Sequence, residues 1–191
     1  MKKSLIGSGG HAREVMSQMG MILPCFVDDK YVDENSLPIS ELNFDEYEVM
    51  IAVGDCNDRM NIVKKLPINV KYFSFIHPTA LIMSNNITIG DGSFIGAHSI
   101  LTNNIKIGNH AILNRGNHIG HDCIVGDFFS AMPNSVVSGN VILGDNVYLG
   151  TNSTIIEKTT ICSNVTIGAN GVVIRDINKE GTYVGVPVKK L

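Results

Sequence analysis

The feature that most constrains the fold is a six-residue repeat in the second half of the chain. Every sixth residue from position 89 to 173 is aliphatic: Ile89, Ile95, Leu101, Ile107, Leu113, Ile119, Val125, Ala131, Val137, Leu143, Leu149, Ile155, Ile161, Ile167 and Val173. Glycine often follows, and the fourth residue after each aliphatic is often small. This period fits neither an α-helix nor one long strand, but it fits a parallel β-helix whose hexads each form one strand and one turn. The aliphatic residues should point inward, with Gly or Asn taking the turn conformation.

Charge divides the chain into two parts. Residues 1–76 hold 19 of the 33 charged side chains, whereas residues 77–178 hold only 10. Three hexads make one coil, so residues 77–178 predict between about five and six coils of all-β structure. Stacked coils need caps at both ends. We therefore predict an α/β domain over residues 1–76, a parallel β-helix over 77–178 and a C-terminal capping segment over 179–191.

The first segment predicts a mononucleotide-binding βαβαβ unit, half of a Rossmann-like fold. A short apolar strand leads into a glycine-rich loop and a helix, where Gly9, Gly10 and His11 could hold phosphates. Asp28 and Asp29 follow a second apolar run and could lie near a base, and a third run ends at Gly54. A full dinucleotide fold needs two such halves, so 76 residues favour the mononucleotide part of a nucleotide sugar. The alternative is a glycine turn kept only for packing.

One pair of residues in the repeat could carry chemistry. His121 lies two positions after the inward-pointing Ile119, so it should fall on an outward turn, and His118 should also face outward. Asp122 adjoins His121, and such an acid can orient an imidazole that serves as general base.

Composition excludes several other functions. A net charge of −3 argues against nucleic acid as the main partner. No run approaches the length of a membrane span, and the apolar stretch after Lys2 and Lys3 is too short for a signal peptide, so we expect a cytoplasmic protein without membrane contact. The four cysteines form no CxxC pair and have no zinc-type spacing, so we expect buried thiols and no metal.

Motifs along almost the whole chain resemble one family. The segments IGSGGHA, FVDD, IAVGD, HPTA, GHDCIVGDF, SGNV and GTYVGVPVKKL are similar to those of the sialic-acid O-acetyltransferase and bacterial nucleotide-sugar N-acetyltransferase family, the NeuD/PglD-like hexapeptide-repeat acetyltransferases. The resemblance implies a left-handed β-helix, a homotrimer with active sites between subunits, and acetyl-CoA as co-substrate.

The resemblance also implies roles for individual residues. His121 would be the general base with Asp122 as its partner, and Asn114 could contact the sugar. Amides near Gly139 and Thr151 would bind the thioester end of acetyl-CoA, with Ala169, Pro187 and Lys190 along the rest of it. Relatives commonly have a second histidine nine residues after the catalytic one; here Ser130 stands there as the candidate cofactor contact.

The implied reaction is N-acetylation of a UDP- or dTDP-linked 4-amino-4,6-dideoxy sugar in polysaccharide biosynthesis, such as that of O-antigen. Two alternatives stay open at this point. One is a sialic acid O-acetyltransferase, and the other is a non-catalytic nucleotide-binding scaffold.

Overall fold

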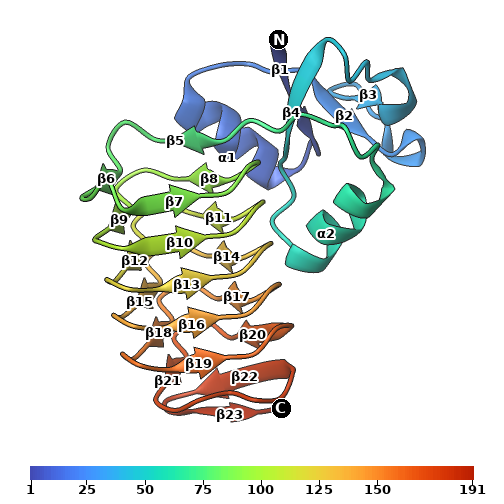
Figure 1. The fold of residues 1–191 in the computed structure, drawn as a ribbon. Coiled ribbons are helices and arrows are strands. Elements are labelled where there is room, and N and C mark those ends of the chain that lie inside the picture. The colour runs from blue at the N-terminus through green and yellow to red at the C-terminus, as the bar shows by residue number, and fades with distance from the viewer.

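A computed structural model describes residues 1–191, and it begins with a small α/β domain. Its four strands are all parallel, in the order β3-β2-β1-β4. The elements are β1 (Lys2–Ile6), α1 (Gly10–Met19), β2 (Cys25–Val27), β3 (Leu37–Pro38), β4 (Tyr47–Ile51) and α2 (Cys56–Lys65). In Figure 1 this domain lies beside the upper end of a tall stack of strands.

The predicted βαβαβ order holds for its first half and differs in its second. Between β2 and β4 the chain forms no α-helix, only β3 and two short 3₁₀ turns, Asp29–Tyr31 and Ile39–Glu41. The connection from β2 to β3, residues 28–36, is too short for a helical crossover, which needs a dozen or more residues. The second helix, α2, instead follows β4 and leads toward the stack.

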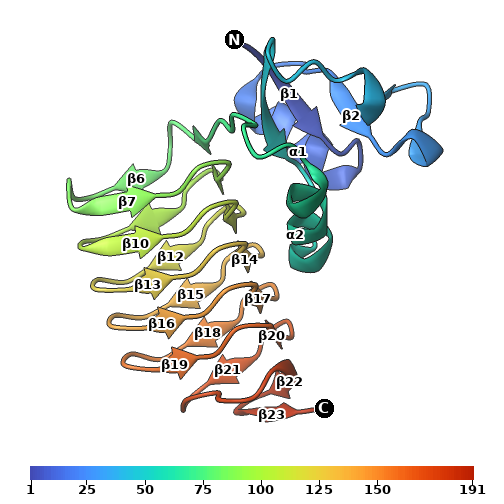
Figure 2. The ribbon, with the colours of Figure 1, turned by 45° about the vertical axis from the view of Figure 1, so that its right-hand side comes forward.

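The rest of the chain is a parallel β-helix of triangular section, here called the prism. Its strands are β5 (Phe75–Ile76), β6 (Leu81–Ile82), β7 (Ile87–Ile89), β8 (Phe94–Ile95), β9 (Ile100–Leu101), β10 (Ile105–Ile107), β11 (Ile112–Leu113), β12 (His118–Ile119), β13 (Ile124–Val125), β14 (Ser130–Ala131), β15 (Val136–Val137), β16 (Ile142–Leu143), β17 (Tyr148–Leu149), β18 (Thr154–Ile155), β19 (Thr160–Ile161), β20 (Val165–Ile167), β21 (Val172–Val173), β22 (Gly181–Gly185) and β23 (Val188–Lys190). They form three sheets, one on each face. Face 1 runs from β5 through β8, β11, β14, β17, β20 and β22 to β23; face 2 holds β6, β9, β12, β15, β18 and β21; face 3 holds β7, β10, β13, β16 and β19. Figure 2 shows the coils stacked one below the other.

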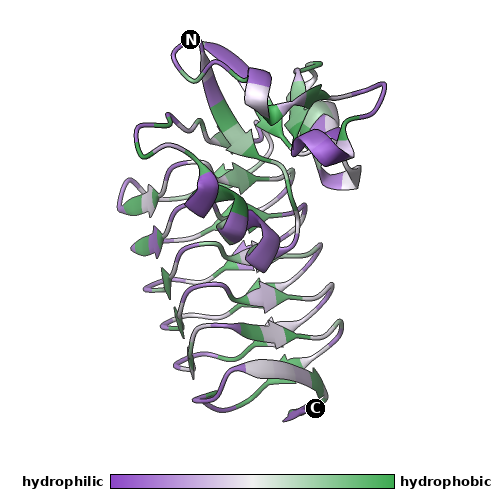
Figure 3. Ribbon diagram, turned by 90° about the vertical axis from the view of Figure 1, so that its right-hand side faces the viewer, coloured by the Kyte–Doolittle hydropathy of each residue, from purple (hydrophilic) through white to green (hydrophobic).

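The six-residue repeat forms the core of the prism as predicted. Strands in neighbouring coils pair 18 residues apart, as Lys106 does with Ile124. Of the fifteen predicted inward residues, fourteen are buried, and only Ile89 at the upper end is partly exposed. The small residues at the fourth position after them, such as Ser99 and Ala111, are buried where the coil turns. In Figure 3 the strands are mostly apolar or intermediate, and hydrophilic stretches fall largely in the turns.

The turns differ from the prediction in one respect. Every sixth residue from Gly92 to Asn170 has a left-handed φ between 51° and 72°, and half of these residues are Asn. The glycines that directly follow the aliphatic residues, such as Gly90 and Gly120, are not in this conformation. They are small because the next coil is close: a Cβ on Gly120 would lie 2.6 Å from the nitrogen of Gly139. Asn thus takes the turn conformation, whereas these glycines permit close stacking of coils.

The lower end of the prism is covered by the last residues. β22 pairs in parallel with β20, and β23 returns antiparallel to β22. No helix of the chain is both long and apolar enough to cross a membrane. Cys25, Cys56 and Cys123 are buried free thiols, as expected, and Cys162 is half-buried.

Candidate functional site

A hydrogen-bonded histidine–aspartate pair lies on one corner of the prism. His121 and Asp122 belong to the turn between β12 and β13, and Nδ1 of His121 lies 2.7 Å from Oδ2 of Asp122. Ile119 is buried at the end of β12, so the chain turns outward and 59% of the His121 side chain is exposed. Asp122 has a φ of 61°, which Asp tolerates better than most residues. The turn therefore presents the imidazole to solvent.

Asn104, one coil above, holds the aspartate of this pair. Its Nδ2 donates to Oδ1 of Asp122 at 2.6 Å. The hydrogen bond from Asn104, and then that from His121, hold the pKa of the Asp122 carboxyl below its usual value. An ionised Asp122 accepts the Nδ1 proton of His121, which leaves Nε2 free to take a proton.

Gly139, one coil below, forms the floor beneath the imidazole. A Cβ at this position would lie 2.6 Å from Nε2 of His121 and 2.7 Å from its Cε1. Only glycine leaves space for the ring in this position. The amide N–H of Gly139 donates to no group of the chain, so an unused hydrogen-bond donor lies close to the ring.

The largest cavity lies in the α/β domain, at the carboxyl ends of its parallel strands. Its volume is about 880 Å³, and it is lined only by residues between 6 and 67. Gly9, Asp28 and Asp29 line it, so the structure brings together three of the residues predicted to bind the nucleotide. The carboxyl end of a parallel sheet is the usual place for a ligand in such folds.

Other residues of this cavity were not identified from the sequence. Tyr31 and Phe44 supply aromatic rings, and Lys30 and Lys65 supply positive charge. They lie in turns and on α2 with no motif spacing. Aromatic rings could stack on a base and lysines could pair with phosphates, so the lining suits a nucleotide.

His11 and Gly10 do not line this cavity. The His11 side chain is only 12% exposed, and its ring lies edge-on to Phe94 of the prism, with centroids 5.6 Å apart. Burial, and then the charge of Arg59, lower the pKa of His11, while Glu14 at 3.7 Å opposes them. The side chain of His11 thus belongs to the contact between the domain and the prism.

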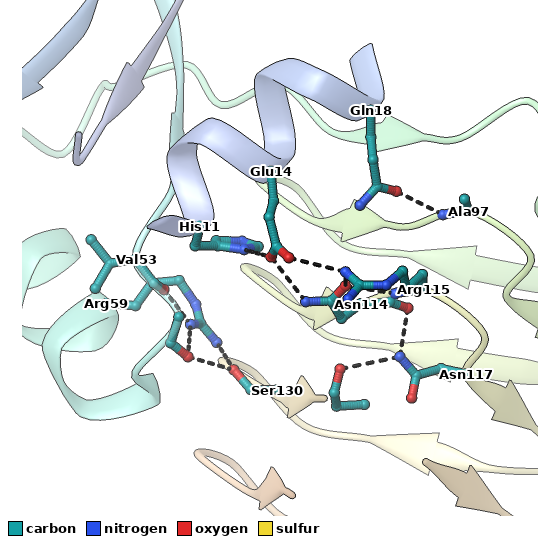
Figure 4. A network of polar contacts seen from close by, with 12 residues as sticks. His11, Glu14, Gln18, Val53, Arg59, Ala97, Asn114, Arg115, Asn117 and Ser130 are labelled. Carbon is teal, nitrogen blue, oxygen red and sulfur yellow. Dashed lines mark hydrogen bonds and ion pairs between the residues drawn. The ribbon is translucent and has the colours of Figure 1, made fainter. Parts of the chain in front are cut away.

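That contact is a polar network, shown in Figure 4. Glu14 of α1 accepts from Arg115 at 3.0 Å and from Asn114 at 3.3 Å. Burial raises the pKa of Glu14, but the hydrogen bonds from Arg115 and Asn114 outweigh it and keep the pKa below its usual value. Gln18 accepts from the amide of Ala97 at 2.8 Å. Asn114 is only 4% exposed, so the residue predicted to contact the sugar lies beneath α1 in this chain.

Arg59 is the centre of the same contact and was not singled out from the sequence. Its guanidinium is completely buried and donates to Ser130 Oγ at 2.8 Å. It also donates to six backbone carbonyls, those of Val53, Gly54, Asp55, His110, Phe128 and Phe129. Ser130 is itself completely buried and donates to the carbonyl of Gly54 at 3.2 Å. In this chain, therefore, Ser130 and Gly54 hold the α/β domain on the prism, and Ser130 has no exposed surface for a cofactor.

The remaining predicted cofactor residues are distributed over three places. Thr151 and Ala169 are exposed at the corner between faces 1 and 2, whereas Gly139 lies with His121 at the corner between faces 2 and 3. Pro187 and Lys190 are exposed in the hairpin of β22 and β23. No group of three or more His, Cys, Asp or Glu residues gathers as a metal site would require.

Within one chain, His121 lies away from the large cavity of the α/β domain, here called the nucleotide-sized cavity. The α/β domain is seated on face 1, through α1 and the beginning of α2. The turn between β12 and β13 lies on the opposite edge of the prism, at the left in Figures 1 and 2, where α2 lies at the right. A reaction that used both would need a second copy of the chain.

The chain combines a hexad β-helix, an exposed His–Asp pair and a domain with a nucleotide-sized cavity. This combination is typical of the hexapeptide-repeat acyltransferases. Residues 4–66 match the family described as PglD N-terminal domain. No curated protein sequence matches the chain.

Solved structures extend the likeness over the full length. PerB from Caulobacter crescentus, in complex with CoA and GDP-perosamine, is 27% identical with a TM-score of 0.88, over 100% of this chain and 97% of that one. The acetyltransferase domain of PglB from Neisseria gonorrhoeae is 27% identical, with a TM-score of 0.85 over 100% and 99% of the two chains. WeeI from Acinetobacter baumannii is 25% identical, with a TM-score of 0.87 over 100% of both.

Over its full length the chain is therefore similar to the NeuD/PglD-like hexapeptide-repeat acetyltransferases. This confirms the predicted family, the predicted acetyltransferase class and the fold of an α/β domain followed by a left-handed β-helix.

Proposed function

We propose that this protein transfers an acetyl group from acetyl-CoA to the amine of a nucleotide-linked amino sugar. The observation that carries the proposal is the His121–Asp122 pair, held by Asn104 and Gly139 on an exposed corner of the prism. The similar PerB structure contains CoA and GDP-perosamine, and the PglB domain was also solved with acetyl coenzyme A. A UDP- or dTDP-linked 4-amino-4,6-dideoxy sugar is the specific substrate that we propose.

His121 acts as general base in this mechanism. The sugar amine bonds to the acetyl carbon, the carbon–sulfur bond breaks, and the thiolate of CoA leaves. Nε2 of His121 takes the proton that the amine loses and passes it to the thiolate. Asp122 keeps the proton of Nδ1 in place and stabilises the imidazolium, as an adjacent carboxylate does in other general-base pairs. The unused N–H of Gly139 is the candidate donor to the carbonyl oxygen as negative charge develops.

We propose a homotrimer whose active sites lie between neighbouring copies. The cavity of one copy and the His121 corner of the next would form one site, since they lie on opposite sides of a single chain. The split of Gly139 from Thr151 and Ala169 supports this arrangement, because one elongated co-substrate would contact two corners only where two prisms meet. Pro187 and Lys190 would lie along its remainder, with the lysine near a phosphate.

The function is tested by an acceptor panel read by release of the CoA thiol. UDP-, dTDP- and GDP-linked 4-amino sugars are compared with free and nucleotide-linked sialic acids. We expect thiol release with a nucleotide-linked amino sugar and none with sialic acids. Release only with sialic acids would identify the O-acetyltransferase alternative, and no release with any acceptor would favour the non-catalytic scaffold.

The shared site is tested by subunit complementation. The variants His121→Ala and Asp28→Ala/Asp29→Ala are each expected to have little activity at limiting substrate. When the two are co-expressed, mixed trimers contain some sites with an intact His121 and an intact cavity, so activity should return. If activity does not return, while the mixed trimers form, the site lies within one chain.

A further inference from the structure

The outward side chains on face 2 of the prism form a column without Asp, Glu, Lys or Arg. In β9, β12, β15, β18 and β21 the second residue is the buried aliphatic residue of the repeat, so the first residue points outward. The pairing of these strands, which are stacked in Figure 2, places the outward residues in line: Ile100, His118, Val136, Thr154 and Val172. Face 3 carries Lys106 in its equivalent column, and face 1 carries the α/β domain. Face 2 therefore differs from both.

His118 is the only titratable residue in this column. Its side chain is exposed and forms no ion pair, whereas that of His121 pairs with Asp122. Its outward neighbours in the sheet are Ile100, one coil above, and Val136, one coil below. A single chain therefore presents an unpaired imidazole between two aliphatic side chains.

The proposed trimer determines where this column lies. One acetyl-CoA would contact Gly139, at the corner between faces 2 and 3 of one copy. It would also contact Thr151 and Ala169, at the corner between faces 1 and 2 of the next copy. These two corners then meet at each contact between copies. Face 2 lies between the two corners, so three copies of face 2 would surround the threefold axis.

The space around this axis is narrow. One side of a coil is a hexad, including its turn, which corresponds to roughly 15–20 Å at about 3.3 Å per residue. The centre of a triangle with sides of this length lies only about 5 Å from each side. The outward side chains of three copies therefore meet at the axis in layers, and the aliphatic layers exclude water there.

We propose that the three His118 side chains of a trimer bind one divalent transition-metal ion, such as Zn²⁺, on the threefold axis. The site rests on the proposed function, which sets the arrangement of the copies. Three imidazole nitrogens and one small further ligand on the axis complete the tetrahedral coordination that Zn²⁺ prefers. The layers of Ile100 and Val136 enclose the ion, which supplies the partner that buried imidazoles need.

Such a site forms only on assembly. Within one chain no three His, Cys, Asp or Glu residues gather, and each copy contributes a single ligand. His121 lies on the turn at the corner, whereas His118 lies in β12 on the face itself. The ion therefore holds the copies together and takes no part in the proposed acetyl transfer.

The test is calorimetry with zinc chloride on protein without a polyhistidine tag, after removal of metal with EDTA. His118→Val removes the imidazole and leaves an aliphatic side chain like those of its neighbours, so the trimer should still form. His98→Asn is the matched control, because His98 is exposed and has the left-handed turn conformation that Asn134 and Asn152 adopt at the same corner. Analytical ultracentrifugation measures dissociation of the trimer with and without zinc.

We expect the wild type and His98→Asn to bind one Zn²⁺ per three chains, and His118→Val to bind it at least tenfold more weakly. Saturating zinc should lower the protein concentration at which half of the trimers dissociate by tenfold or more, except in His118→Val. One ion per chain, no zinc binding by the wild type, or equal binding by His118→Val would overturn the proposal. The wild-type stoichiometry tests it even if His118→Val does not assemble.

Failure of this inference differs from failure of the proposed function. Thiol release by a wild type that does not bind one zinc ion per three chains leaves the function intact and overturns the metal site. If no acceptor gives thiol release, the function fails, and the site still holds where trimers bind one zinc ion through His118. A wild type that forms no trimer with zinc present would overturn the site.

Discussion

Replacing His110 by Asn should make the stability of the protein less sensitive to mild acid. The His110 side chain lies between the prism and the α/β domain, stacked on Phe128 with centroids 5.1 Å apart and edge-on to Tyr72 at 4.5 Å. Only 5% of the residue is exposed, and its Nδ1 is buried without a partner. Burial, and then the charge of Arg59, lower the pKa of His110 from 6.5 to about 4.

The size of the effect follows from these two pKa values. Below pH 6.5 the unfolded chain binds a proton at His110, whereas the folded chain does not until about pH 4. Stability that is fully present above pH 6.5 is therefore lost as the pH falls toward 4. The whole difference corresponds to about 3 kcal/mol, of which about 2 kcal/mol is lost between pH 7.5 and 5.

The assay is urea unfolding at pH 7.5 and at pH 5, at one protein concentration because an oligomer is expected. His98→Asn is the matched control, since His98 has the same left-handed φ, near 60°, but is exposed. His110→Asn should lower stability at pH 7.5 through lost packing, yet lose about 2 kcal/mol less than the wild type on going to pH 5. His98→Asn should behave like the wild type. Equal acid sensitivity of the wild type and His110→Asn would refute this reasoning.

Three further substitutions test the site and its support. Arg59→Met should lower the free energy of unfolding by on the order of 3–5 kcal/mol, because six backbone carbonyls and Ser130 Oγ each lose a hydrogen bond from the buried guanidinium. The exposed Arg13→Met should change it little, and urea unfolding measures both. Gly139→Ala should lower kcat tenfold or more without changing the unfolding midpoint, because its Cβ would displace the His121 ring, and unchanged kcat would show that the ring is not held there. Asn104→Ala should lower kcat severalfold without changing the unfolding midpoint, because the Asp122 carboxylate loses the hydrogen bond that holds it beside His121; an unchanged kcat would exclude this positioning role.

The prism could be predicted from the sequence because its contacts are local and periodic. Each coil repeats every 18 residues, so the inward aliphatic residues and the outward position of His121 follow from counting. The turn conformation was harder, because two positions in each hexad favour small or flexible residues for different reasons. Gly120 stacks closely on the next coil, whereas Asn140 takes a left-handed φ.

The contact between the domain and the prism could not be predicted in the same way. Arg59 and Ser130 are 71 residues apart, and no repeat relates them. The side chains of His11, Asn114 and Ser130 suit a ligand site, yet in this chain they lie in the contact between the two domains. His11 packs against the prism, and the other two contact the α/β domain. The sequence alone does not identify Asn104 as the partner of Asp122, because Asn is frequent in the turns. Only its position one coil above Asp122 distinguishes it.

Turnover by His121→Ala tests the general-base mechanism most directly. Thiol release is measured with acetyl-CoA and the amino sugar nucleotide that the wild type prefers, and size-exclusion chromatography checks that the oligomer is intact. We expect turnover to fall by on the order of 10²–10⁴, because Nε2 of His121 no longer accepts the proton from the amine. Turnover equal to that of the wild type would contradict the assignment of His121 as the catalytic base.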